Sequence, residues 1–272
     1  MDEAVDSVLA QSYQNFEIVI VNDGSTDELS IEILKNYKNI KTTVLHTTNK
    51  GLPSARNYAI KMSNGKYILP LDADDKIGST YIEKAVNLLE ADSNIGIVYC
   101  KAELFGDQTG IWQLPEYKFP DILLDNVIFC SGFFRKDDWE KVGGYNHEMI
   151  YGWEDYDFWL SIIELGREVH CISDTLFYYR RQFGSMVELI KEHHHVYSYT
   201  KMFKKHPDLY FQNIETVFSE IVTLRSDLQH TRSKLERSQS RILAMESSKF
   251  WKLRQLWFRI KNKLGLMKTP DI

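Results

Sequence analysis

The chain has 272 residues, of which 43% are hydrophobic and 13% aromatic. This composition is typical of a globular protein with a sizeable core, and it excludes a disordered chain. No apolar stretch approaches the roughly 18 residues that a membrane-spanning helix requires, and residues 1–20 lack the features of a signal peptide. We therefore expect neither a membrane span nor export by an N-terminal signal.

The net charge of −5 is unevenly distributed along the chain. Residues 211–272 contain 12 of the 33 Lys and Arg but only 6 of the 38 Asp and Glu. A basic tail on an acidic body argues against a nucleic-acid binder, and it indicates that the tail has a partner of its own. The three cysteines are far apart and form no CxxC pair, which is typical of reduced thiols in a cytosolic protein.

Strands and helices alternate over the first hundred residues. FEIVIVND is a continuous apolar run rich in β-branched residues, as in a buried strand, and the turn formers NDGSTD overlap its end. The predicted order is helix 3–12, strand 16–23, helix 28–38, strand 43–46, helix 51–63, strand 66–71, helix 79–91 and strand 95–100. This alternation indicates an α/β fold with a Rossmann-like, mainly parallel sheet and helices on both faces.

The pattern is looser between residues 102 and 185. Short strands are predicted near 127–134 and 169–178. A helix begins at Trp153–Glu154–Asp155 and ends at Leu165, because Gly166 follows. Two more helices are expected between 186 and 206.

Three carboxylates, Asp72, Asp74 and Asp75, follow a predicted strand within four positions. Ligands of an open α/β sheet bind at the carboxyl ends of its strands, so we expect this cluster and Asp23 to face one crevice. Mg²⁺ or Mn²⁺ would neutralise the cluster and hold the phosphates of a ligand. A structural explanation has similar weight, since Asp75 would then cap the next helix. A strand followed by DxD also begins phosphoaspartate hydrolases, but Lys76 stands where those enzymes carry Thr or Val.

Six motifs occur in series: FEIVIVNDGSTD, NKGLPSARN, GKYILPLDADD, EKVGGYN, YGWEDYDFWL and YYRRQFGSM. In this order and spacing they closely resemble the family 2 glycosyltransferases. The resemblance implies an inverting enzyme of the GT-A fold that uses a nucleotide-sugar. It also implies a glycosyltransferase domain at 1–190, with a donor half at about 1–101 and an acceptor half at about 102–190.

The first two motifs carry the donor-binding residues that this resemblance implies. Asp23 would recognise the nucleoside, and Gly24 and Ser25 would form the turn beneath it. Arg56 would face the nucleotide or its phosphates.

The DADD motif carries the metal site that the resemblance implies. Asp72 would approach the ribose and the metal, and Asp74 would be the principal ligand of Mn²⁺ or Mg²⁺. Such a cation stabilises the negative charge that builds on the departing phosphate.

The Glu-Asp pair carries the implied catalytic base. Asp155 would take the proton of the acceptor hydroxyl, with Glu154 beside it, and the dipole of a helix that begins there would keep it ionised. Acids are also common in first helical turns for capping alone, but the series of motifs favours the catalytic role. On the acceptor side we expect Gly132 and Trp153, whose ring would stack on a sugar.

Two features depart from the family pattern. Family members open with an apolar strand and a loop, whereas this sequence begins at the helix that follows, so the first strand is apparently lacking. Gln182 stands where many relatives carry a His, and the HHH at 193–195 is no obvious substitute because consecutive helix positions diverge. These departures leave a second interpretation open: a catalytically weakened nucleotide-sugar-binding scaffold that oligomerises through its tail.

The predicted helical extension at 191–247 contains a heptad pattern. Apolar residues recur every seven positions from Ile214 to Ile242, and the matching positions are interrupted by Thr231 and Ser238. This pattern predicts a coiled coil and a homo-oligomer. The alternative is an amphipathic helix packed on the catalytic domain.

A basic amphipathic helix is predicted within 248–272, where residues 248–268 contain seven basic and no acidic residues. One face carries Leu253, Trp257, Ile260 and Leu264, and the opposite face carries Lys252, Arg259 and Lys263. This pattern is typical of an interfacial helix on an anionic membrane surface, and a protein or RNA partner is the alternative.

Together these features predict a metal-dependent inverting glycosyltransferase, cytoplasmic and peripheral on the inner face of the cell membrane. Its donor would be a nucleotide-sugar, foremost a UDP-sugar. Its acceptor would be a glycan or a lipid-linked sugar of cell-surface polysaccharide biosynthesis.

Overall fold

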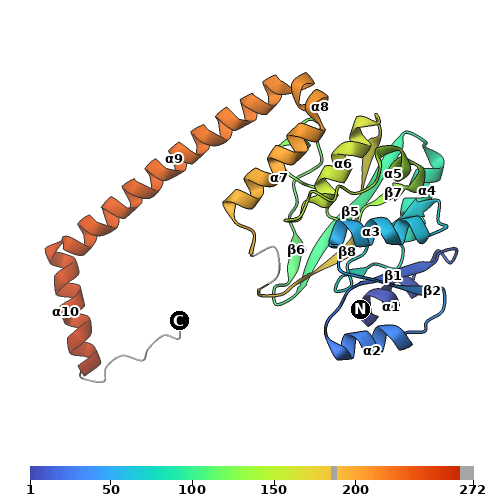
Figure 1. The fold of residues 1–272 in the computed structure, drawn as a ribbon. Coiled ribbons are helices and arrows are strands. Elements are labelled where there is room, and N and C mark those ends of the chain that lie inside the picture. The colour runs from blue at the N-terminus through green and yellow to red at the C-terminus, as the bar shows by residue number, and fades with distance from the viewer. Residues whose placement is uncertain (185–188, 264–272) are drawn as a thin grey trace. The chain divides into compact units, whose positions relative to one another are not determined.

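The computed structural model describes residues 1–184 and 189–263 (Figure 1). Contacts divide the chain into two compact units, Met1–Ile214 and Glu215–Ile272. The helices are α1 (Asp2–Leu9), α2 (Glu28–Asn36), α3 (Leu52–Met62), α4 (Tyr81–Ala91), the 3₁₀ turn η1 (Asp121–Leu123), α5 (Lys136–Val142), α6 (Glu154–Glu164), α7 (Glu192–Lys205), α8 (Pro207–Gln212), α9 (Ile214–Ser247) and α10 (Lys249–Lys263). The strands are β1 (Ile18–Asp23), β2 (Thr42–Thr47), β3 (Tyr67–Ile68), β4 (Lys76–Ile77), β5 (Ile95–Gly106), β6 (Gly110–Trp112), β7 (Phe133–Arg135) and β8 (Glu168–Arg181).

The alternation of strands and helices predicted for the first hundred residues is confirmed, but several boundaries differ. The strand predicted at 66–71 is reduced to β3, because Pro70 has no N–H to donate to a ladder. The strand predicted near 127–134 is reduced to β7. Between 186 and 206 the described residues contain one α-helix, α7. The second helix, α8, begins after this range at Pro207, a residue that is favoured at the first position of a helix.

The strand pairing combines two long parallel pairs with four short antiparallel pairs. β1 pairs with β2, and β5 with β8, in parallel. The pairs β3–β7, β5–β7, β4–β8 and β5–β6 are antiparallel. The reason is that β7, from the second half of the domain, enters between β3 and β5 and runs antiparallel to both. The two predicted halves therefore share one six-stranded sheet, while β1 and β2 form a sheet of their own.

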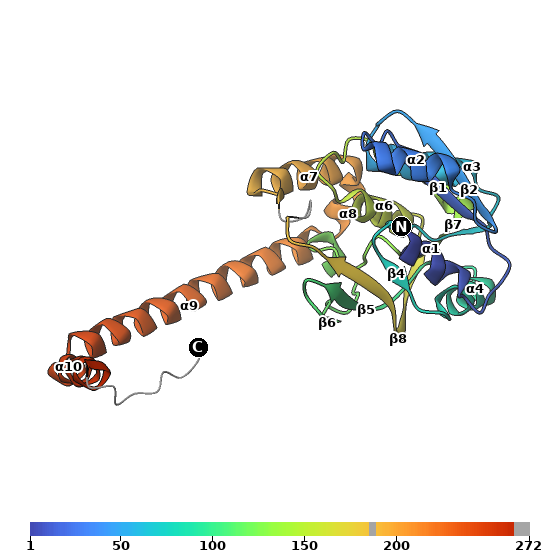
Figure 2. The ribbon, with the colours of Figure 1, turned by 90° about the horizontal axis from the view of Figure 1, so that it is seen from below.

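Helices cover both faces of the six-stranded sheet, and the two phenylalanines of β7 show how. Successive side chains of a strand point to opposite faces. Phe133 packs edge-on against Tyr81 of α4, whereas Phe134 contacts Phe158 and Trp159 of α6. At one edge of this sheet, α1 packs beside β4, as Figure 2 shows.

Helices α7 and α8 belong to the first unit, which therefore extends beyond residue 190. The ammonium group of Lys205 donates to the buried carboxylate of Asp157 at 2.6 Å. The next residue, His206, lies 2.6 Å from Glu164 through Nδ1. Both acids belong to α6. The last residue of α7 and the residue after it therefore bind the helix that begins with the Glu-Asp pair.

The described part of the second unit consists of two helices with exposed apolar side chains. α9 is one continuous helix of 34 residues, ~51 Å long, as the heptad pattern predicts. Its exposed apolar residues include Ile221, Leu224, Leu228, Leu235, Ile242 and Met245. α10 exposes Phe250, Leu253, Leu256, Trp257 and Ile260. Leu264 and the side chains of Lys252 and Lys263, which belong to the predicted amphipathic pattern, lie outside the described part of the chain.

Among the helices that the structure describes, none is both long and apolar enough to cross a bilayer. This agrees with the absence of a long apolar run in the sequence.

We predict that Phe134→Ala lowers the free energy of unfolding by about 3–5 kcal/mol, because the fully buried ring fills space between β7 and α6. Unfolding in guanidinium, followed by the fluorescence of the tryptophans in the first unit, measures the change. Ile111→Ala is the control, since Ile111 is exposed on β6, and it should change the free energy by less than about 0.5 kcal/mol. Equal effects of the two variants would contradict the packing described here.

Candidate active site

Arg56 of α3 joins three segments that are distant in the sequence. Only 9% of its side chain is exposed. Its Nη2 donates to Asp72 Oδ1 at 2.8 Å, and its Nη1 donates to Glu154 Oε1 at 2.5 Å. The helix α3, the DADD loop and the start of α6 therefore meet at one guanidinium. The resemblance implies that Arg56 faces the nucleotide or its phosphates, and in this structure the guanidinium also binds two carboxylates.

Asp155 lies next to this group in the first turn of α6. Its side chain is half-buried, and its Oδ1 accepts a hydrogen bond from the amide of Tyr156 at 2.7 Å. Burial, reinforced by the negative charge of Glu154, raises the pKa of Asp155 to about 7. Burial therefore opposes the effect of the helix dipole, which favours the ionised form of this carboxylate.

Trp153, directly before the two acids, has an unusual backbone conformation. Its φ of 67° is in the left-handed region, which a bulky residue rarely adopts. The ring lies 4.8 Å from the ring of His195 and 4.9 Å from that of Tyr199, both on α7. Because His194 also stacks on Tyr151 at 4.1 Å, the HHH segment packs against the loop that leads into α6. Sequence analysis missed this contact, since it joins segments about forty residues apart.

The three carboxylates of the DADD loop lie in different environments. Asp74 is exposed, and Asp72 is half-buried against Arg56. Asp75 is buried, and its Oδ1 accepts a hydrogen bond from the amide of Arg180 at 2.8 Å. Burial, together with the charges of Asp72 and Asp74, raises the pKa of Asp75 to about 8, although the Arg180 amide opposes the shift. Asp75 does not cap the next helix, which begins after Thr80.

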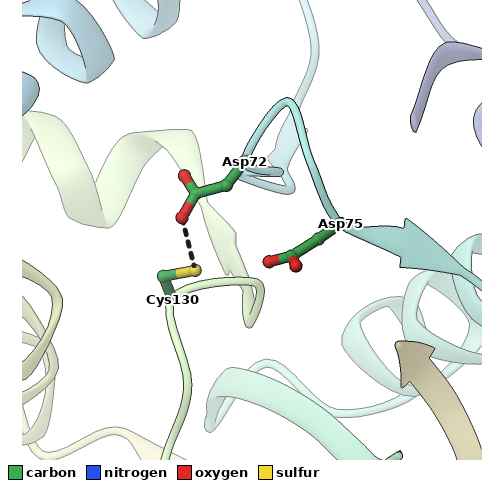
Figure 3. Close-up of side chains that lie close together, drawn as sticks. All are labelled: Asp72, Asp75 and Cys130. Carbon is green, nitrogen blue, oxygen red and sulfur yellow. Dashed lines mark hydrogen bonds between the residues drawn. The ribbon is translucent and has the colours of Figure 1, made fainter. Parts of the chain in front are cut away.

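Cys130, in the segment before β7, faces the same loop. Its Sγ donates to Asp72 Oδ2 at 3.5 Å (Figure 3). Burial and the charge of Asp72 raise the pKa of the thiol well above its usual value. Ligand atoms of Asp72, Asp75 and Cys130 lie within 4.8 Å of one another, which is close enough for one metal ion. The donor set therefore fits a divalent cation at Asp72, whereas Asp74 is not part of this group.

Asp23 lies at the end of β1 and organises the approach to α3. Its carboxylate accepts hydrogen bonds from the amides of Lys50 and Gly51 at 3.0 and 2.8 Å. The following turn is held by the amide of Ser25, which donates to Asn22. Gly24 is required there, because its φ is 74° and a Cβ would lie 2.5 Å from the amide nitrogen of Asn49. The predicted turn beneath Asp23 is thus present.

A pocket of about 460 Å³ lies beside Asp23. Its walls consist of Asp23, Thr47, Lys50, Ser54, Tyr58 and His147. On one side, Ser54 Oγ lies 3.0 Å from His147 Nδ1. Sequence analysis found neither of these two residues, although His147 directly follows the EKVGGYN motif.

Two other expected positions have different surroundings. Gly132 packs against Trp159, since a Cβ there would lie 3.2 Å from the indole ring. Gln182 follows β8 and is exposed. The structure thus brings together Arg56, Asp72, Glu154 and Asp155. Among the interactions described above, Asp74, Gly132 and Gln182 make no contact with that group.

Comparisons with known proteins agree with this arrangement. The family model for glycosyl transferase family 2 matches residues 1–184. An uncharacterized glycosyltransferase of Rickettsia typhi is 32% identical over 177 residues, which cover 61% of this chain and 55% of the relative. The uncharacterized glycosyltransferase YibD of Escherichia coli is 36% identical over 144 residues, which cover 51% of this chain and 38% of the relative.

The solved structures of S. aureus TarS 1–349 have the same fold. The complex with UDP-GlcNAc matches with a TM-score of 0.57 and 21% identity over 70% of this chain and 57% of TarS 1–349. The complex with UDP matches with a TM-score of 0.54 and 22% identity over 66% and 56% of the respective chains. These likenesses confirm the GT-A type of α/β fold.

The family assignment rests on most of the first unit. The chain spans 55% of the length of the relatives from Rickettsia typhi and Rickettsia prowazekii. The matched residues 1–184 include the DADD loop, the Glu-Asp pair and the Arg56 group that joins them. The chain belongs to glycosyl transferase family 2.

Proposed function

We propose that this protein transfers a sugar from a nucleotide-diphosphate donor, foremost a UDP-sugar, to a hydroxyl group of a glycan or lipid-linked acceptor. The observation that carries the proposal is the position of Asp155, which is half-buried and directly follows Glu154, the residue that Arg56 joins to Asp72 of the DADD loop. Family membership supports the reaction class. The UDP and UDP-GlcNAc complexes of TarS support the choice of donor.

The donor would lie between Asp23 and the DADD loop. Asp23 borders the pocket proposed for the nucleoside, with Gly24 and Ser25 in the turn behind it. The positive charge of Arg56 lies directly behind Asp72, where it favours the approach of a diphosphate.

Asp72 and Asp74 would hold the Mn²⁺ or Mg²⁺ that the family implies. Both offer carboxylate oxygens, which these hard cations prefer, and Asp74 is exposed to an incoming diphosphate. When bound, the cation supplies charge stabilisation to the departing phosphate.

Asp155 would act as the base of an inverting reaction. An oxygen of its carboxylate accepts the proton of the acceptor hydroxyl, and that hydroxyl then attacks the sugar from the face opposite the nucleotide. Since Oδ1 is held by the amide of Tyr156, Oδ2 is the oxygen proposed for the proton. Trp153, on the acceptor side of the pair, would present its ring to a sugar.

We predict that Asp155→Asn lowers the transfer rate by about 10²–10⁴-fold and leaves donor binding unchanged, because only proton removal is affected. Calorimetry with UDP-sugars measures binding, and single-turnover assays measure transfer. Asp137→Asn is the matched control, since Asp137 is an exposed acid in the first turn of α5. If Asp155→Asn transfers sugar at a near-normal rate, Asp155 is only an acid at the start of a helix and not the base. A wild-type protein that binds donor but transfers to no acceptor would favour the scaffold interpretation.

We predict that the transfer rate rises with pH through a midpoint at about 7 and then levels off, because the raised pKa of Asp155 keeps it protonated in acid. A protonated carboxyl group cannot take the acceptor proton. Glu154→Gln removes a neighbouring negative charge and should move the midpoint to lower pH. The pH–rate profile of both proteins tests this, with donor binding followed over the same range. A flat wild-type profile would exclude Asp155 as the titrating base.

The second unit is proposed to place the enzyme at a membrane and to mediate self-association. The exposed apolar side chains of α10 would enter the lipid interface, and the basic residues would be attracted to anionic headgroups. From Ile221 to Met245 the apolar heptad positions of α9 are exposed in the single chain, as the seam of a coiled coil would be before a partner binds.

We predict that the full-length protein sediments with anionic vesicles and that Leu253→Ser with Trp257→Ser weakens this binding even at low salt, because insertion is lost. High salt should weaken wild-type binding, since the surface field decays within about 8–10 Å at physiological ionic strength. Leu228→Ser with Leu235→Ser on α9 is the control. It should retain vesicle binding while shifting the oligomeric state in sedimentation. If the wild-type protein does not sediment with anionic vesicles at low salt, the membrane proposal is refuted.

A further inference from the structure

Cys130 differs from the other two cysteines in what its sulfur faces. Cys100 is buried in β5, and the sulfur of exposed Cys171 contacts the carbonyl oxygen of Ile172. The sulfur of Cys130 lies 3.5 Å from Asp72 Oδ2 and points into the DADD loop (Figure 3). A thiol placed between carboxylates has the chemistry of a metal ligand once it loses its proton.

Asp75 supplies an independent indication that a ligand is missing from this cluster. Only 1% of the residue is exposed. Its Oδ1 is bound by the amide of Arg180, but its Oδ2 is buried without a hydrogen-bond partner in the described part of the chain. Leaving a buried carboxylate oxygen without a donor is costly, so such atoms usually have a partner that a bare chain does not contain. In Figure 3 the carboxylate of Asp75 points toward Cys130 and Asp72.

The geometry and the charge of the cluster suit one divalent cation. The three ligand atoms lie within 4.8 Å of one another, and bonds of about 2.0–2.3 Å to Zn²⁺ would need only a small inward movement of the side chains. The second oxygen of Asp72, Oδ1, is already held by Arg56. Two carboxylates and a thiolate would outweigh the charge of Arg56, which is also shared with Glu154.

We propose that Asp72, Asp75 and Cys130 bind a thiophilic divalent cation such as Zn²⁺, with water as the remaining ligand. Thiolate ligands favour Zn²⁺ and Co²⁺ over Mg²⁺ and Mn²⁺, which prefer oxygen alone. This site is distinct from the pair Asp72 and Asp74 proposed for the donor metal, and it shares only Asp72 with it. Binding transfers the thiol proton to solvent as the metal–sulfur bond forms.

Co²⁺ titration of the reduced full-length protein, without donor, tests the site. Thiolate coordination produces a charge-transfer absorption band, so the readout does not depend on activity. We expect a band that saturates at one Co²⁺ per chain, is displaced by Zn²⁺ and persists in excess Mg²⁺. Cys130→Ser should abolish the band, and the matched control Cys171→Ser should retain it.

Two aspartate variants separate this site from the donor metal. Asp75→Asn should weaken Co²⁺ binding at least about tenfold, whereas Asp74→Asn should leave it unchanged. Absence of the band in the wild type, its persistence in Cys130→Ser or its loss in Cys171→Ser would overturn the proposal. Equal weakening by Asp74→Asn and Asp75→Asn would also overturn it. Circular dichroism reports folding, and if Cys130→Ser is unfolded, the two aspartate variants decide.

Discussion

The ion pairs of Arg56 are the constraint on which the site depends. A buried guanidinium must be paired, and here its partners come from the DADD loop and from the first turn of α6. Removing one partner of a buried pair typically costs about 3–5 kcal/mol, because the other charge stays buried. Arg56 therefore fixes the distance between the loop proposed to hold the donor and the helix that carries Asp155. The same side chain would therefore position both the proposed donor binding and the proposed proton removal.

The same group also sets the electrostatics of Asp155. Glu154 raises the pKa of Asp155, and Arg56 opposes that rise. Arg56 also pairs with Asp72, so its positive charge offsets only part of the rise that burial causes in the pKa of Asp155. The outcome is a carboxylate that titrates close to neutral pH, which suits a base that must both hold and release a proton. A solvated acid at a helix start would have been ionised but a weaker proton acceptor.

Sequence patterns predict the elements and the acids, but not the contacts between them. The apolar run of β1 and the Glu-Asp start of α6 are local signals, and both occur where they were predicted. The partners of Arg56, 16 and 98 positions away, depend on how the halves of the domain meet. The same holds for Cys130 beside Asp72 and for His147 beside Ser54. The antiparallel position of β7 could not be predicted for the same reason, since no local pattern shows that β7 enters between β3 and β5.

The DADD loop tolerates three carboxylates because each is directed to a different partner. Asp72 is held by Arg56, and the buried Asp75 is held at one oxygen by the Arg180 amide. The guanidinium of Arg180 also binds the backbone carbonyl of Asp74 at 2.8 Å, so the apex of the loop is fixed while its carboxylate stays exposed. Repulsion between the acids is thus relieved by two arginines, Arg56 and Arg180. Among the described residues, what is left for a ligand is the exposed carboxylate of Asp74 and the buried, unpartnered Oδ2 of Asp75. Of the two, only the carboxylate of Asp75 lies beside a thiol, which favours a softer cation.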